Sequence, residues 1–149
     1  MPLWLIFHPV GTFEDSASKQ AFAEDITQFY TSALGLPAFY VVANFIKLSL
    51  NDTWVGGKQK TDKPFIRVVI NHVAYTVPNI DEAYKRATAS IDKILKPHVA
   101  DKDYDWEYHV DETDRRLWKL NGMIPPAAKS EQEQQWAKEN RAVLYEGAS

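Results

Sequence analysis

The chain has 149 residues, of which 45% are hydrophobic and 25% are charged, and its formal net charge is −3. This composition is typical of an ordinary globular protein. A nucleic-acid partner is not expected, because such proteins usually carry a basic run or patch and this sequence contains no basic run. The absence of cysteine excludes disulfides, thiolate nucleophiles and cysteine-based zinc sites. His8, His98 and His109 lack metal-binding spacing, so no metal is expected.

No stretch of the sequence is typical of a membrane span. The longest apolar stretch, Phe39 to Leu50, is interrupted by Asn44 and Lys47. The first residues, MPLWLIFHPVG, contain no charged region before the apolar run, which is not typical of a signal peptide. We therefore expect a soluble cytoplasmic protein with no membrane partner. The length favours one domain over residues 1–149.

The first third of the chain predicts a strand, a helix and a second strand. Leu3–Phe7 is a short apolar run that is typical of a buried strand. From Ser16 onward, apolar residues recur at helical spacing until Gly35 ends the pattern. Phe39–Ser49 is rich in Val, Ile and aromatic residues and predicts the second strand. Together these elements form a first β-α-β unit over about residues 2–50.

The same order of elements returns after a polar connector. Phe65–Val73 is a β-branched run that predicts a strand. Apolar residues at helical spacing predict a helix over Ile80–Leu95, with Pro97 closing it. Tyr104–Val110 predicts the fourth strand. The second unit covers about residues 64–111.

The repeated order predicts the fold class. The first predicted strands of the two units start at Leu3 and Phe65, which are 62 residues apart. A helix that joins two strands favours a right-handed parallel crossover. We therefore predict an α/β fold of two fused β-α-β units, with a four-stranded sheet and two helices on one face. The alternative is a ferredoxin-like β-α-β-β-α-β fold, which would be expected as a dimer with an apolar ligand between sheet and helices. In that fold the two middle strands usually meet in a short hairpin, whereas a longer polar connector separates them here.

The C-terminal tail, about residues 112–149, is predicted to be mostly irregular. Ser130 and Glu133 have the spacing of a capping box and open a short polar helix that extends to about Asn140. Trp136 is its only large apolar residue. A polar helix of this kind is not stable alone, so we expect it to dock on its own chain or on a neighbouring subunit.

The dipeptide Met1-Pro2 is the candidate reactive feature. Methionine before proline is normally removed during synthesis, which would expose a secondary amine at the start of a buried strand. An α-amino group has a pKa of about 7.7–8.0, and burial lowers it. Such an amine can act as a base, as an acid or as a nucleophile toward a carbonyl. The alternative is an ordinary strand residue, because about 5% of all residues are proline.

The chain resembles a known family over nearly its full length. The segments that carry the resemblance are MPLWLIFHP, LGLPAFYVVANF, FIRVVINHVAYTVP, DWEYHVDETDRRLWKLNG and WAKENR. With these segments the chain resembles the tautomerase superfamily, in particular the branch of cis-3-chloroacrylic acid dehalogenase and its fungal oxalocrotonate tautomerase-like relatives. The resemblance implies a homotrimer with Pro2 at the floor of a pocket. It also implies a small carboxylate substrate and chemistry that needs no metal or organic cofactor.

The resemblance suggests further site residues. The strand tyrosine of the dehalogenase, which helps to place the attacking water, falls on Tyr108, and its helix histidine falls on or near Tyr30. Its two carboxylate-binding arginines fall near His72 and Tyr75. Its water-activating glutamate falls at about Lys119, so this glutamate is missing and dehalogenation or hydration is expected to be weak at most.

The departures from the family pattern have chemical consequences. Tyr75 offers one neutral hydrogen-bond donor where a guanidinium would grip a carboxylate with two. Arg115 and Arg116 are candidates for the missing anion contact, or are solvated charges of a loop. His72 is otherwise a hydrogen-bonded core histidine, and Tyr108 otherwise packs beside its strand neighbours.

These considerations lead to two hypotheses about function. In the first, the protein is a cofactor-independent tautomerase or isomerase of a small enol or unsaturated carboxylic acid. Pro2 is its general acid and base, and Tyr108 and His72 polarise the carbonyl or orient the substrate. The candidate substrate-binding residues are Tyr30, Tyr75, Arg115 and Arg116. In the second, the protein is a non-catalytic trimer of the same fold that binds a small molecule or serves as a scaffold.

Overall fold

The computed structural model describes all residues from 1 to 149. Its main sheet has four strands in the order β2 (Val42–Leu48), β1 (Pro2–Pro9), β5 (Phe65–His72) and β6 (Asp105–Glu112). The pairs β1–β2 and β5–β6 are parallel, whereas the central pair β1–β5 is antiparallel. This confirms the two fused β-α-β units. The ferredoxin-like alternative is wrong, because there a third strand separates the two strands that each helix joins.

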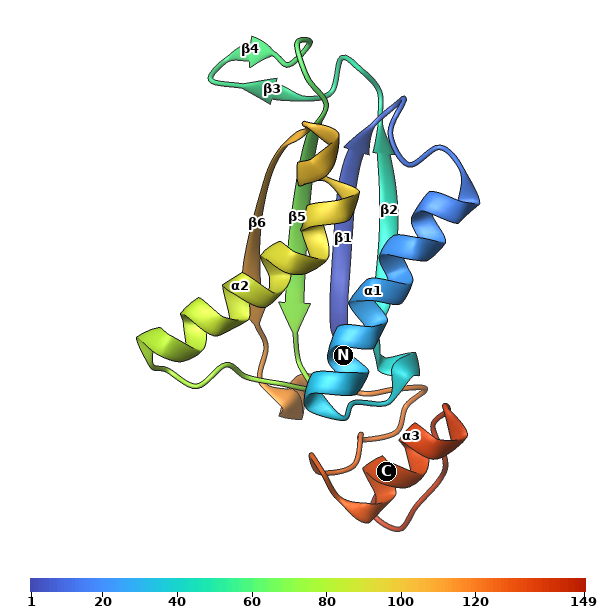
Figure 1. Ribbon diagram of the computed structural model, residues 1–149. Coiled ribbons are helices and arrows are strands. Elements are labelled where there is room, and N and C mark those ends of the chain that lie inside the picture. Colours follow the sequence, from blue (N-terminus) through green and yellow to red (C-terminus); the bar gives the residue numbers. More distant parts are fainter.

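Two long helices, α1 (Ser16–Leu34) and α2 (Asp81–His98), cover one face of the sheet (Figure 1). The Asp15 carboxylate caps α1 by accepting the Ser18 N–H at 2.7 Å. The helix ends as predicted at Gly35, whose φ of 67° is unfavourable for other residues. In contrast, α2 does not end before Pro97. It continues through the proline by one residue, because only the last turn has to tolerate its missing N–H.

The core lies between the sheet and the two helices. Along β1 and β5 buried side chains alternate with half-buried ones, as expected for strands with two unlike faces. The buried set points toward α1 and α2 and comprises Trp4, Ile6, Ile66, Val68 and Ile70, which pack with Phe22, Ile26, Ile91 and Leu95. No helix covers the opposite face of the sheet (Figure 1). That face presents half-buried apolar side chains, among them Leu3, Leu5 and Val69.

The connector between the two units forms a separate hairpin at one end of the molecule (Figure 1). Its strands are β3 (Trp54–Val55) and β4 (Lys58–Gln59), and they pair antiparallel. The turn contains Gly56 and Gly57, whose φ values of 59° and 77° suit glycine. Short 3-10 turns lie at Ala38–Tyr40, Ala100–Lys102 and Arg115–Leu117.

The tail docks on its own chain. Its helix α3 (Glu131–Glu139) lies beyond the end of the sheet at which β1 begins (Figure 1). Trp136 is only 1% exposed and packs against Phe39 and Tyr40. The Ser130 hydroxyl accepts the Glu133 N–H, as the capping-box spacing predicted. No helix of the structure is both long and apolar enough to cross a membrane. The single-domain organisation of residues 1–149 stays a prediction.

Candidate functional site

The start of the chain lies beside the end of the other central strand. Pro2 is buried at the beginning of β1, and its partner across the antiparallel pairing is His72. Met1 is attached in this structure, and its carbonyl oxygen accepts a hydrogen bond of 3.2 Å from the Val73 N–H. The Pro2 nitrogen is therefore an amide here, and Met1 carries the terminal amine at the edge of the same site.

The surroundings of the terminus favour a neutral amine. Burial is the main cause that lowers the pKa of the Met1 amine to about 4, and the nearby Arg115 guanidinium acts in the same direction. Glu133 acts in the opposite direction and only partly offsets them. Removing an ammonium group from water disfavours its charged form. This end of β1 therefore provides an environment in which an amine stays deprotonated near neutral pH.

A chain of hydrogen bonds connects three core residues on the helix-covered side of the sheet. The indole N–H of Trp4 donates to the Tyr30 hydroxyl oxygen at 3.1 Å, and this hydroxyl lies 2.7 Å from Nε2 of His72. Indole nitrogen can only donate, so the Tyr30 oxygen accepts from Trp4 and its own O–H is free to donate to His72. We therefore assign the proton of the neutral His72 ring to Nδ1.

His72 is suited to donate a hydrogen bond but not to act as a charged acid. Burial lowers the pKa of His72 to about 4, and the positive charge of the terminal amine acts in the same direction. The side chain is only 4% exposed, and its Nδ1 atom has no partner. A buried unpaired donor is costly, and such groups are often found where a ligand supplies the missing partner.

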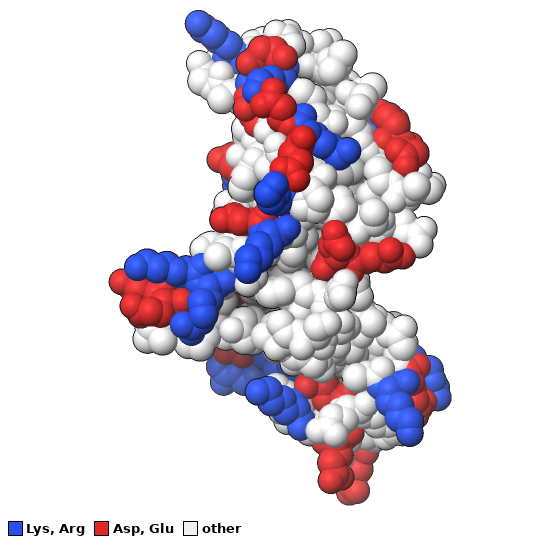
Figure 2. Space-filling model, viewed as in Figure 1, with Lys and Arg blue, Asp and Glu red and all other residues white.

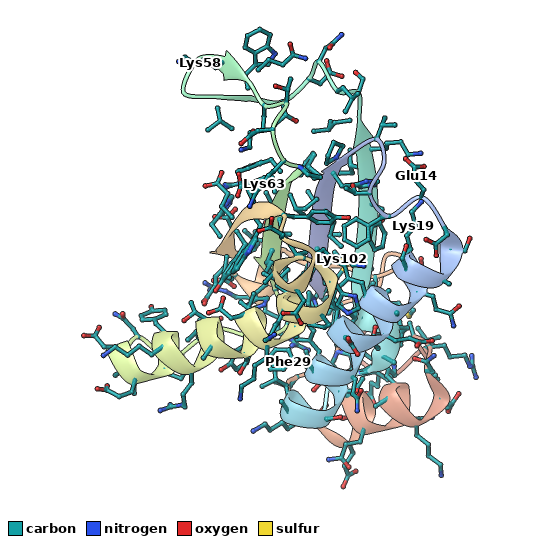
Figure 3. The ribbon with its side chains drawn as sticks, turned by 45° about the horizontal axis from the view of Figure 1, so that its top comes forward. Glu14, Lys19, Phe29, Lys58, Lys63 and Lys102 are labelled. Carbon is teal, nitrogen blue, oxygen red and sulfur yellow. The ribbon has the colours of Figure 1, made fainter.

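A cavity of about 300 Å³ lies between α1 and α2, and three of the predicted site residues line it: Tyr30, His72 and Tyr75. Phe29 lies where α1 faces α2, at this cavity (Figure 3). The other lining residues are mostly apolar; they are Ala33, Leu34, Pro78, Ala83, Ala87 and Ile91, with Arg86 and Ser90 as the polar members. The cavity can therefore hold a small, largely apolar molecule next to the His72 ring. Pro2, which the resemblance places at the floor of a pocket, lines neither this cavity nor the second cavity beside His72.

Tyr108 lies in a different place from Tyr30 and Tyr75. It lines a second cavity of about 240 Å³ between α2, β5 and β6, which His72 also lines. Its hydroxyl donates to Asp92 Oδ1 at 3.0 Å and also lies 3.3 Å from the Thr88 carbonyl oxygen, both on α2. Burial, together with Asp92, raises the pKa of Tyr108. Tyr108 therefore lies at a cavity that His72 also lines, as the prediction of a shared site requires. Within this chain, however, the Tyr108 hydroxyl is already hydrogen-bonded to α2.

The two candidate arginines differ sharply. Arg115 Nη1 donates to the Ala74 carbonyl oxygen at 2.9 Å, while Nη2 donates to the Pro126 carbonyl oxygen at 2.5 Å and to Glu133 Oε1 at 2.8 Å. This guanidinium thus ties the tail to the segment after β5, beside the chain terminus. Arg116, in contrast, is 88% exposed and pairs with Asp114. Of the two arginines, only Arg115 influences the terminal amine, and neither lines a cavity beside His72.

Three residues near the site were not predicted from the sequence. The sequence predicts only a capping role for Glu133, yet its carboxylate is buried. Oε1 accepts a hydrogen bond from Arg115, and Oε2 accepts one from the Lys129 N–H. Trp4 lies two residues after Pro2 in the predicted strand, so both side chains point to the same face of the sheet, and this alternation could have identified Trp4. Arg86 lies one turn after Ala83 on α2. The small residues Ala83, Ala87 and Ser90 recur at helical spacing on the same side of this helix, and this pattern could have indicated the cavity wall. No group of three or more His, Asp or Glu side chains could hold a metal ion.

Comparisons with known proteins give one family. The family described as "Putative oxalocrotonate tautomerase enzyme" matches residues 1–141. The chain is similar to native RhCC from Rhodococcus jostii, with 35% identity, a TM-score of 0.90 and coverage of 96% of this chain and 99% of that one. It is also similar to "a probable enzyme" from the thermophilic fungus Aspergillus fumigatus, with 42% identity, a TM-score of 0.87 and coverage of 97% and 98%.

A fused 4-OT, solved as a symmetric trimer, shares only the fold, at 15% identity and a TM-score of 0.59, with coverage of 86% of this chain and 99% of that one. Among curated protein sequences, none matched the chain.

Proposed function

Because the chain belongs to the oxalocrotonate tautomerase family that matches residues 1–141, we propose that it is a tautomerase whose acid and base is the amine of Pro2. The substrate is a small enol or an unsaturated carboxylic acid, and no cofactor takes part. The observation that supports this proposal most is the environment at the start of β1, where burial lowers the pKa of the Met1 amine to about 4 and where Pro2, the next residue, is itself buried.

The proposed reaction moves one proton between carbon and oxygen of the substrate. The neutral Pro2 amine takes the proton of the enol hydroxyl, and negative charge develops on this oxygen of the enolate. His72 donates its Nδ1–H to this oxygen, since the ring is neutral and the donor has no other partner. Protonated Pro2 then delivers the proton to the neighbouring carbon, which gives the ketone. These steps need only one base. Glu112 is the register partner of His72 in the β5–β6 pairing and lines the second cavity with it, and its Oε1 accepts the Val77 N–H at 3.0 Å.

The uncovered face of the sheet supports assembly into a homotrimer. Leu5 and Val69 lie opposite each other in the β1–β5 register on the face that no helix covers (Figure 1). An apolar sheet face of this kind is normally buried against another layer. The fused 4-OT is described as a symmetric trimer. A trimer of this chain in which the three uncovered sheet faces pack together would bury these side chains.

A second candidate function is non-catalytic binding of a small molecule. A Met1 retained in the natural protein would favour it, because the Pro2 nitrogen would then be an amide that neither accepts nor donates a proton. Hydratase or dehalogenase activity is proposed only as a weak side reaction, since Lys119 stands at the approximate position of the water-activating glutamate.

Two measurements separate these proposals. Mass spectrometry of the intact protein determines whether Met1 is present. Ketonisation of phenylenolpyruvate, followed by ultraviolet absorbance, then compares the parent with Pro2→Ala. We expect kcat/KM to fall by at least about 100-fold, in line with the loss of a well-placed acid and base. Equal rates in the two proteins would overturn the catalytic proposal.

A further inference from the structure

We propose that Arg86 binds the carboxylate of the substrate and that the cavity between α1 and α2 selects carboxylic acids with a large apolar group. For its use in catalysis this inference rests on the proposed function, but the binding itself does not. It assigns a role to a residue that the sequence did not single out, and it narrows the substrate from small acids in general to acids with an aromatic or long alkyl group.

Arg86 differs from every other arginine of the chain in its partners. Arg67, Arg115, Arg116 and Arg141 each form an ion pair with a carboxylate. The Arg86 guanidinium takes part in no ion pair and donates no hydrogen bond. Charged side chains of both signs gather on the projecting first turns of α2 (Figure 2). A guanidinium without a partner can bind a carboxylate through two parallel hydrogen bonds.

The position of Arg86 places the residue in the wall of the cavity. Arg86 lies on the second turn of α2 and is the only charged residue among those that line the cavity. Its side chain is exposed, so it sits at the rim, where an anion can approach without losing all of its water. Lys85, the adjacent residue, has the same charge but does not line the cavity. The geometry therefore distinguishes Arg86 from its neighbouring cation.

The other lining residues determine which group the ligand carries besides its carboxylate. Most lining residues are apolar, and the volume of about 300 Å³ is at the lower end of small-molecule sites. His72 also lines this cavity, and its Nδ1 atom is buried without a partner. A molecule with a carboxylate for Arg86, an adjacent oxygen for His72 and an apolar group against Phe29, Leu34 and Ile91 would satisfy all three features. A very small acid would leave most of the apolar wall in contact with water.

The test measures binding of the unreactive acid 3-phenylpropanoate to the full-length protein by isothermal titration calorimetry, with propanoate and 3-phenylpropanamide as comparison ligands. We expect 3-phenylpropanoate to bind best of the three. Arg86→Gln is expected to weaken it by about tenfold or more, as the loss of a charge-assisted contact implies. Arg86→Lys should retain part of the affinity, since it keeps the charge but loses the bidentate geometry.

Lys85→Gln is the matched control, because it removes the same charge from the same exposed helix turn. Its affinity should equal that of the parent. Equal losses in Arg86→Gln and Lys85→Gln, no loss in either, or tighter binding of propanoate would each overturn the inference. Binding does not require turnover, so a protein that binds as expected but shows no tautomerase activity would contradict the proposed function and leave this inference standing.

Discussion

The Tyr30 hydroxyl lies 2.7 Å from Nε2 of His72, and this contact couples a helix residue to the strand that faces the chain terminus. Tyr30 comes from α1 and His72 from the end of β5, and both are buried. Because the hydroxyl also accepts the indole N–H of Trp4, its own proton is directed at His72. In this arrangement Tyr30 positions His72 and fixes its protonation rather than contacting the reacting atoms.

Tyr30→Phe should change the tautomer of His72. Without the hydroxyl, Nε2 of His72 and the Trp4 N–H both lose their partner, which is expected to cost about 1–3 kcal/mol of unfolding free energy. The ring should then populate both tautomers, which the nitrogen-15 shifts of His72 report directly by NMR. Activity should fall by at least about tenfold, since the donor toward the substrate oxygen is no longer held in place. An unchanged tautomer would contradict the assignment.

Stability should depend on pH through His72. Its pKa is lowered from 6.5 to about 4 in the folded protein, so the unfolded chain takes up the proton first as the pH falls. The contribution of His72 to stability is therefore fully present above about pH 6.5 and is lost as the pH falls toward 4, by an amount on the order of 3 kcal/mol. Burial also lowers the pKa of His8, which adds to the loss in the same direction.

Urea unfolding at pH 7 and pH 4.5 measures this effect. His72→Gln should lose clearly less stability between the two pH values than the parent, because glutamine does not titrate. A difference between parent and variant that is independent of pH would show that His72 is protonated in the folded protein as readily as in the unfolded chain.

Glu133→Gln should alter both stability and the pKa of the terminal amine. Glu133 is 3% exposed and neutralises Arg115, so its loss leaves a partly buried cation, at a cost of about 3 kcal/mol. Glu133 raises the pKa of the amine, and the variant should therefore lower it further. The acidic limb of the pH–rate profile is expected to move to lower pH. Glu131→Gln, on the exposed side of the same helix, is the control and should leave both quantities unchanged.

The uncovered sheet face predicts how the subunits associate. Val69→Lys places a charge among apolar side chains that the proposed trimer buries, so the variant should sediment as a monomer while the parent sediments at three times that mass. Leu50→Lys is the control, because Leu50 is already 61% exposed. A parent protein that sediments as a monomer or a dimer would contradict the trimer.

The sequence predicted the scaffold better than the site. Alternating strands and capped helices depend on local patterns, so α1 ended at Gly35 as expected and the two β-α-β units were found. The contacts of Tyr30 with His72 and Trp4 join three elements that are far apart in the chain, and no local pattern encodes them. Likewise, Glu133 follows the rule for a capping box, but its buried partner Arg115 lies in a different segment. From the sequence, Arg115 and Arg116 are equal candidates for the anion contact that the family pattern lacks here, whereas burial separates them.

The central claim is that a neutral amine of Pro2 acts as the base, and a pH–rate profile tests it most directly. The protein used must be shown by mass spectrometry to lack Met1. We predict that kcat/KM for phenylenolpyruvate stays level from pH 8 down into the acidic range and falls only when the amine, with its lowered pKa, is protonated. A profile that already falls below pH 8, or full activity in a preparation that retains Met1, would contradict this account.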